Sequence, residues 1–155
     1  MKIIECVPNI SEGRDKRIIT AVADTLTNHD VKLLDIDPGV DTNRTVITFI
    51  GEPKEVIKAA YDLIKKASEL IDLNKHIGTH ARMGATDVCP LIPISNVSMD
   101  ECITYANDLS KKVSIDLKIP VFLYEKSATN NKGKSDTLLS ESDLPRSNYK
   151  LPSKI

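Results

Sequence analysis

The sequence His76-Ile77-Gly78-Thr79-His80-Ala81-Arg82-Met83-Gly84-Ala85-Thr86-Asp87 joins two segments of different hydrophobic periodicity. Residues 53–73, before it, carry apolar side chains at helical spacing, and residues 88–94, after it, form a short apolar run typical of a buried strand. Reactive polar residues on such connections commonly serve a functional site. Gly78 and Gly84 would allow a positive φ or a close approach of the backbone to a ligand. We therefore expect a helix-to-strand connection that carries the chemistry.

The segments on the N-terminal side predict a β-α-β-β-α order. Residues 2–7 form a strand, and residues 18–28 have the apolar spacing of a helix. Residues 31–37 and 44–50 are β-type runs with a short link, which suggests an antiparallel hairpin. The helix over residues 53–73 opens with a proline in its first turn.

The segments on the C-terminal side add a strand, a helix and a second strand. After the strand at 88–94, Ser98 is a candidate N-cap with Glu101 completing a capping box, and the helix runs to about residue 117. Residues 119–124 are expected to form the final strand. The first six elements match the split βαβ, or ferredoxin-like, pattern of an α+β domain with its helices mainly on one face of a sheet.

The composition indicates one domain followed by a tail. Residues 1–124 have the apolar density of a folded domain, whereas residues 125–155 read as a polar tail or linker. A net charge of -1 and an aromatic content of 4% disfavour a nucleic-acid interface. No apolar run is long enough for a membrane span, and Glu5 and Pro8 interrupt any signal peptide. We therefore expect a cytoplasmic protein with no nucleic-acid or membrane partner.

The three cysteines, Cys6, Cys89 and Cys102, are widely spaced and lie in apolar surroundings. This pattern favours reduced thiols, and inert core residues are the expected reading.

Short motifs occur along the chain in one consistent order: Glu5–Gly13, Leu33–Gly39, Asn43–Val46, Phe49–Gly51, Leu70–Asp72, His76, Gly78, His80, Arg82–Ala85, Asp87–Pro90, Met99–Cys102 and Pro120–Tyr124. Together they resemble the N-terminal subdomain of the glutamate formimidoyltransferase (formiminotransferase) family. That family transfers a formimino group between N-formimino-glutamate and tetrahydrofolate. The resemblance implies a ferredoxin-like subdomain and a folate-linked site, with tetrahydrofolate as a substrate and no metal.

The chain departs from the family in two ways. Ala81 follows the motif histidine where the family commonly has proline, so the loop loses a stiffening residue but no reactive group. Family members also carry a second subdomain, with folate in a channel between the two, and the Pro-Asp-Phe-Gly-Pro-type segment has no match here. We expect either a second subdomain on a separate chain or a homo-oligomer to complete the site.

The resemblance makes His80 the general acid/base of the transfer. An imidazole can take a proton from the attacking nitrogen and return one to the leaving nitrogen. On spacing alone, a histidine that caps the preceding turn is the commoner case. Asp37 is the candidate carboxylate to orient the imidazole, with Asp35 as the alternative, although an Asx-turn role is common for such residues.

The remaining site candidates would bind substrate. Arginine binds carboxylates in a bidentate manner, and both substrates carry carboxylates. The polar loop residues could equally stabilise turns. The substrate- and folate-binding candidates are Arg82, Arg44, Asn9, Ser11 and Asn43, with Arg14 as a weaker one.

A metal site is a lesser alternative. His76 and His80 are four residues apart, with Asp87 and Cys89 nearby, but Gly78 lies between them and no H-E-x-x-H pattern is present.

Three hypotheses about function follow. The first is formimino transfer completed by a second subdomain or partner. The second is a non-catalytic folate-binding or regulatory module that keeps only the N-terminal half. The third is a bare structural domain, which would bind no folate.

Overall fold

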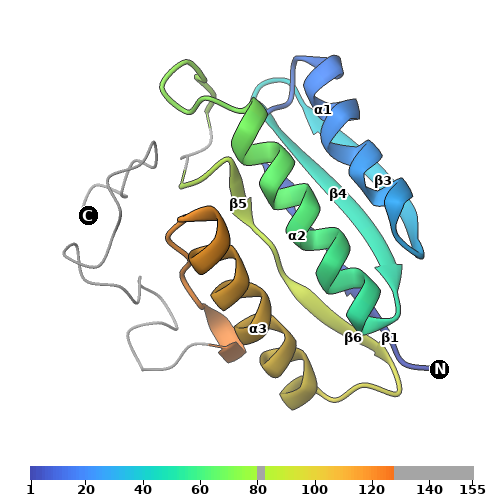
Figure 1. Ribbon diagram of the computed structural model, residues 1–155. Helices are drawn as coiled ribbons and strands as arrows, with labels where there is room; N and C mark the ends of the chain where they lie inside the picture. Colours follow the sequence, from blue (N-terminus) through green and yellow to red (C-terminus); the bar gives the residue numbers. More distant parts are fainter. Residues whose placement is uncertain (80–82, 128–155) are drawn as a thin grey trace.

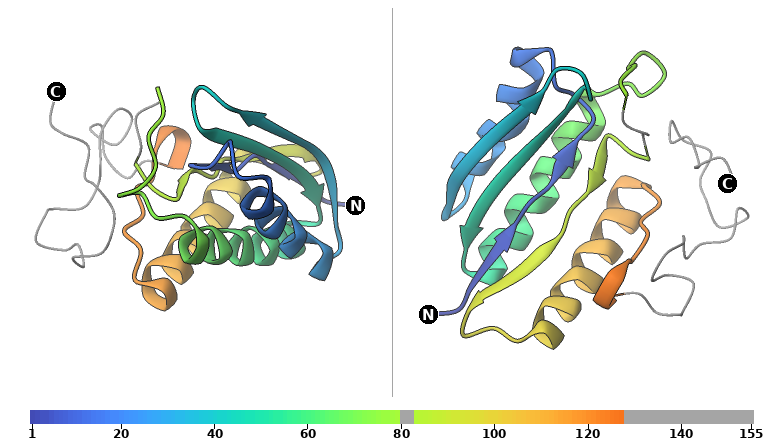
Figure 2. Two further views of the ribbon diagram at one scale, coloured as in Figure 1. Left: turned by 90° about the horizontal axis from the view of Figure 1, so that it is seen from above. Right: turned by 180° about the vertical axis from the view of Figure 1, so that it is seen from behind.

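The central strand β4 (Arg44–Gly51) alternates between side chains buried under helices and side chains on the opposite face of the sheet. Thr45, Ile47 and Phe49 are fully buried, and the residues between them are half-buried. This period of two is expected of an antiparallel strand that is covered on one face. In the computed structural model, which describes residues 1–79 and 83–127, helices α1, α2 and α3 all lie on that one face (Figures 1 and 2). The domain is therefore α+β, with a curled antiparallel sheet.

The helices and strands follow one another in the predicted order over most of the chain. The elements are β1 (Ile3–Cys6), β2 (Asn9–Ile10), α1 (Lys16–Ala23), the 3-10 helix η1 (Asp24–Asn28), β3 (Val31–Gly39), β4, α2 (Pro53–Leu70), β5 (Thr86–Val88), β6 (Leu91–Ser95), α3 (Met99–Leu117) and the 3-10 helix η2 (Glu125–Ser127). No helix within these described ranges is long and apolar enough to cross a membrane.

The sheet is built around β4, and all its pairings are antiparallel. One side of β4 pairs with β3, which confirms the predicted hairpin. The other side pairs with β1 and then with β2, which in turn pair with β6 and β5. The core lies between the sheet and the helices, where the largest fully buried side chains include Ile4, Ile10, Val22, Ile47, Phe49, Val56 and Leu63.

Two neighbouring strands are interrupted by prolines. The predicted strand at 2–7 is followed, after Pro8, by the short strand β2, and the predicted strand at 88–94 is divided into β5 and β6 at Pro90. Proline has no N–H to donate to a ladder, so it interrupts pairing. The backbone oxygens of both prolines still accept, Pro90 O from Val7 N at 3.2 Å and Pro8 O from Ile47 N at 3.0 Å.

The C-terminal part confirms one prediction and corrects another. Ser98 caps α3 with the predicted capping box, because its side chain accepts from Glu101 N and the Glu101 carboxylate accepts from Ser98 N. The predicted strand at 119–124 was wrong: these residues form no strand. Lys118 ends α3 with a φ of 57°, and Ile119 is buried against the core. The apolar residues of the run at 119–124 therefore reflect the packing of Ile119 against the core after the end of α3.

The strand β6 lies at an edge of the sheet. It pairs with β1 on one side, and no strand of the described ranges pairs with its other side. Pro93 lies in the middle of β6 opposite Ile4, between the exposed side chains of Ile92 and Ile94. Most of the predicted polar tail, from residue 128 onward, lies outside the described residues.

Candidate functional site

The predicted connection leaves α2 and reaches β5 at the end of the molecule where the β3–β4 turn and the start of α1 also lie (Figure 1). The structure describes this connection except for residues 80–82, so two predicted site residues, His80 and Arg82, lie outside the described residues. Neither Gly78 nor Gly84 uses the positive φ that glycine allows, because no described glycine has one. The residues on both flanks, however, are held by specific contacts.

The first flank is held by a buried imidazole–carboxylate pair. His76 Nε2 contacts Glu12 Oε2, and His76 Nδ1 donates to Asp72 O at 2.7 Å. The side chains of His76 and Glu12 are only 15% and 4% exposed. A carbonyl oxygen and an ionised carboxylate only accept hydrogen bonds, so both ring nitrogens of His76 face acceptors.

Glu12 is ionised because backbone donors surround it. Burial by itself would raise the pKa of this carboxyl. The backbone N–H groups of Asp15 and Arg14 donate to it at 2.9 and 2.8 Å, and with His76 they lower its pKa below the ordinary value. The loop at 12–15 therefore offers a preformed anchor for the imidazole.

Asn43 and Asp41 hold the same flank from the β3–β4 turn. Asn43, which has a φ of 48°, accepts from Gly13 N at 2.8 Å and donates to Ile77 O at 3.3 Å. Thr79 N donates to Asp41 O at 3.2 Å. The chain up to residue 79 is thus attached to the turn between β3 and β4.

The second flank is held by Ser11 and Asp87. The fully buried Ser11 hydroxyl donates to Gly84 O at 2.7 Å, and Ser11 N donates to Ala85 O at 2.8 Å. Asp87 Oδ1 accepts from Met83 N at 2.8 Å and from Gly84 N at 3.3 Å. Both flanks of residues 80–82 are therefore tied to one end of the sheet.

Asp37, Arg44 and Asn9 lie at this end on the face of the sheet that carries no helix. In the antiparallel pairing Val46 is opposite both Asn9 and Asp37, so the three side chains form a row across the sheet. Arg44, two residues before Val46, shares that face, and its Nε lies 3.6 Å from Asp87 Oδ2. The Asp37 side chain is exposed, and Asn9 donates to Val7 O at 2.9 Å. The structure thus brings Asp37, Arg44 and Asn9 to the end of the sheet to which both flanks of residues 80–82 are tied.

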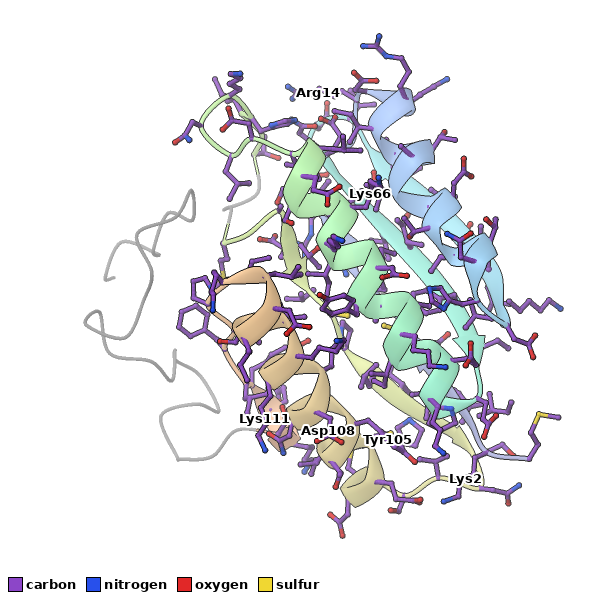
Figure 3. All side chains as sticks on the ribbon, viewed as in Figure 1. Lys2, Arg14, Lys66, Tyr105, Asp108 and Lys111 are labelled. Carbon is purple, nitrogen blue, oxygen red and sulfur yellow. The ribbon has the colours of Figure 1, made fainter. Side chains whose placement is uncertain are left out.

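The other candidates occupy different positions. Asp35, opposite Thr48, is further along β3 from the turn than Asp37. Arg14 lies at the end of the molecule that carries the β3–β4 turn, which is called the loop end below (Figure 3). Its Nε donates to Val40 O at 2.9 Å. Ser11 and Asn43 direct their side chains to backbone atoms of the loops.

Sequence reasoning missed Glu12 and the partnership of His76. The pair joins residues 64 apart in the chain, and only the tertiary structure brings them together. The sequence signal that was available for Glu12 is an acidic residue that closely follows a predicted strand and lies within a run of turn-forming residues. Both ring nitrogens of His76 have partners, and among the described residues no group of three or more His, Cys, Asp or Glu side chains could hold a metal ion.

Comparison with known proteins matches residues 3–142 to the N-terminal subdomain of the formiminotransferase domain. A formimidoyltransferase-cyclodeaminase of Dictyostelium discoideum is 47% identical over 131 residues, which cover 84% of this chain and 24% of that protein. A glutamate formimidoyltransferase of Streptococcus pyogenes serotype M1 is 43% identical over 129 residues, which cover 83% of this chain and 43% of that protein. The chain thus spans less than half the length of these curated relatives. Since the family match covers most of its residues, the chain belongs to the formiminotransferase domain family, as the N-terminal subdomain.

Proposed function

We propose that this chain supplies half of a folate-linked site for formimino transfer between N-formimino-glutamate and tetrahydrofolate. Relatives named as formimidoyltransferases support the reaction class. The observation that carries the proposal is the attachment of both flanks of residues 80–82 beside Asp37 and Arg44. A loop held at both ends keeps a reactive group in place at little entropic cost when substrate binds.

In the proposed step, the amine of tetrahydrofolate attacks the formimino carbon and glutamate leaves. His80 takes a proton from the attacking nitrogen and returns one to the leaving nitrogen, and Asp37 stabilises the charged imidazole. Arg82 and Arg44 bind substrate carboxylates, and Asn9 adds a polar contact on the open face. Ser11 and Asn43 act through the loops that they hold. No metal takes part.

We also propose a ferredoxin-like assignment for the fold and a second subdomain over the open face of the sheet. The strand order β3-β4-β1-β6 with all neighbours antiparallel supports the former, since it is the arrangement of a split βαβ sheet. The exposed side chains on the helix-free face support the latter, since that face has no cover among the described elements. A separate subdomain chain and a second copy of this chain are the two candidates for that cover.

A chimaera tests the activity. Residues 1–124 would replace the matching segment of the Streptococcus pyogenes glutamate formimidoyltransferase, and transfer would be followed by mass spectrometry of the folate product and free glutamate. We expect transfer in the chimaera and a loss of about 10²–10⁴-fold in kcat for His80→Ala. Transfer that survives His80→Ala would overturn the assignment of the acid/base.

Carboxylate variants and calorimetry separate the role of Asp37 from that of Asp35, and catalysis from folate binding. Asp37→Asn should lower kcat, whereas Asp35→Asn should not, and the reverse result would assign the carboxylate to Asp35. Asp108→Asn, on α3 and away from the loop end, is the control for a surface carboxylate (Figure 3). Calorimetry of the chimaera with reduced folate separates catalysis from binding, since tight binding without turnover would favour the regulatory module.

A further inference from the structure

Two cysteines from distant parts of the chain meet in the structure. Cys6 Sγ lies 3.5 Å from Cys89 Sγ, and both thiols are free. Cys6 is the last residue of β1 and is fully buried, whereas Cys89 follows β5 and is half-buried. The contact joins residues that are 83 positions apart.

The backbone already holds the two thiols in place. Cys6 is opposite Leu91 in the β1–β6 pairing, and Val7 N donates to Pro90 O at 3.2 Å directly beside Cys89. A disulfide has an S–S distance of about 2.05 Å, so the sulfurs need to approach by about 1.5 Å. Side-chain rotation with a small backbone shift can supply such a movement, because the strands are already neighbours.

The two thiols differ in their access to solvent. Burial raises the pKa of the Cys6 thiol well above its usual value, and the neighbouring Cys89 raises it further. Cys6 therefore stays protonated and shielded. Cys89, which is partly exposed, is the thiol that a small reagent can reach first. An exposed attacking thiol beside a shielded resolving thiol is a common arrangement in redox-sensitive proteins.

We propose that Cys6 and Cys89 form an oxidisable dithiol that closes to a disulfide when hydrogen peroxide reacts with Cys89. The Cys89 thiolate attacks one peroxide oxygen, the O–O bond breaks, and Cys89 becomes a sulfenic acid while the other oxygen leaves as water after protonation. The Cys6 sulfur then displaces the hydroxyl from Cys89, which leaves with the Cys6 proton as a second water. Two thiols are oxidised by two electrons, and one peroxide is reduced.

The disulfide would tie β1 to the connection between β5 and β6. Asp87, two residues before Cys89, holds Met83 N and Gly84 N, so the link would reinforce the second flank of the loop. The inference itself does not depend on the proposed transfer reaction, because it rests only on the two sulfurs and the strands that carry them.

The test uses the full chain, reduced and then titrated with hydrogen peroxide. Remaining thiols are labelled with N-ethylmaleimide in denaturant and counted by intact mass. Because the chain has three cysteines, we expect the number of labels to fall from three to one. Peptide mapping should show a Cys6–Cys89 link that dithiothreitol reverses. The oxidised chain should melt about 5–15 °C higher, since the link closes a long loop.

Single variants give the controls. Cys102→Ser should still lose two labels, and Cys89→Ser should lose none at the same peroxide concentration, whereas Cys6→Ala should lose only the label of Cys89, as a sulfenic or sulfinic acid with no link. If Cys6→Ala does not fold, Cys89→Ser still decides the result. In the parent chain, sulfinic acid on Cys89 without a link, a disulfide that includes Cys102, or a link between two chains would each overturn the proposal.

Discussion

At the scale of single residues, the Glu12 carboxylate joins two loops at the end of the molecule where the β3–β4 turn lies. The carboxylate is almost fully buried, and it accepts from two backbone N–H groups and from His76. Burying a charge is costly unless hydrogen bonds and an opposite charge compensate. All of its partners belong to the loop at 12–15 or to the histidine connection, so this one carboxylate links the two loops.

Replacing Glu12 by glutamine tests this link. The amide keeps the size of the side chain but removes the charge that faces the imidazole of His76. We expect Glu12→Gln to lower the free energy of unfolding by about 1–3 kcal/mol, measured by urea denaturation at pH 7. Glu52→Gln, at an exposed position, is the matched control and should change it by less than about 0.5 kcal/mol. Equal effects of the two variants would contradict the structure.

The same pair determines how stability depends on acid. The pKa of Glu12 in the folded chain lies below its ordinary value of 4.5. Ionised Glu12 therefore stabilises the folded state above pH 4.5, and this contribution is lost as the pH falls through the folded pKa. We expect the unfolding free energy of Glu12→Gln to fall less steeply between about pH 5 and 3 than that of the parent chain. Parallel curves would show that other carboxyls carry the acid dependence.

Gly13 is required for a different reason, which is the close approach of two backbone segments. A Cβ at this position would lie 2.2 Å from Gly39 O and 2.6 Å from Arg44 N. Because both are backbone atoms of the hairpin, the clash can be relieved only by moving a strand. We expect Gly13→Ala to destabilise the chain by about 1–3 kcal/mol or more, measured by thermal and urea unfolding. Gly51→Ala, whose nearest contact is a valine methyl at 3.1 Å, should cost less.

At the scale of elements, α3 depends on its cap. The Ser98 side chain and the Glu101 carboxylate satisfy each other's backbone N–H groups at the start of the helix. Ser98→Ala should cost about 1 kcal/mol of unfolding free energy, measured by urea denaturation. Ser110→Ala, within the helix, should be neutral or slightly stabilising because alanine is the better helix former. A larger cost at Ser110 would mean that its bond to Asn107 O matters more than the cap.

The elements also show which parts of the fold could be predicted from the sequence. The Ser98–Glu101 box, the proline at the start of α2 and the β3–β4 hairpin depend on neighbours in the chain, so local patterns identified them. The run at 119–124 has the composition of a strand, but Pro120 lacks a donor and Ile119 packs against the core instead. The breaks at Pro8 and Pro90 follow from the same chemistry and could have been predicted.

The site was predictable only in part, for a related reason. Asp37 and Arg44 could be placed near each other because they lie at paired ends of one hairpin. The contacts of Ser11, Glu12 and His76 depend on which loops meet when α2 packs against the sheet, and no local pattern encodes that meeting. His80 and Arg82 rest on the resemblance, since they lie outside the described residues.

At the scale of the whole molecule, the helix-free face of the sheet is the largest unpartnered feature of the described chain. Ile92 and Ile94 are 38% and 54% exposed there. We expect the double variant Ile92→Ser/Ile94→Ser to bind less of a hydrophobic fluorescent dye than the parent chain at equal concentration. Ile115→Ser, which removes an even more exposed isoleucine from α3, should change dye binding much less. A stronger effect of Ile115 would place the apolar surface on the helices.

Pro93 limits how this molecule can aggregate. Proline has no N–H to donate, so the edge strand β6 has one donor fewer at Pro93, where its pairing with β1 also shifts register. A proline on an edge strand disfavours the addition of a further strand. Here it lies between the exposed side chains of Ile92 and Ile94. Fibrillar stacking through this border is therefore discouraged, and it is the broad surface of the sheet, not its rim, that remains available for lasting contacts.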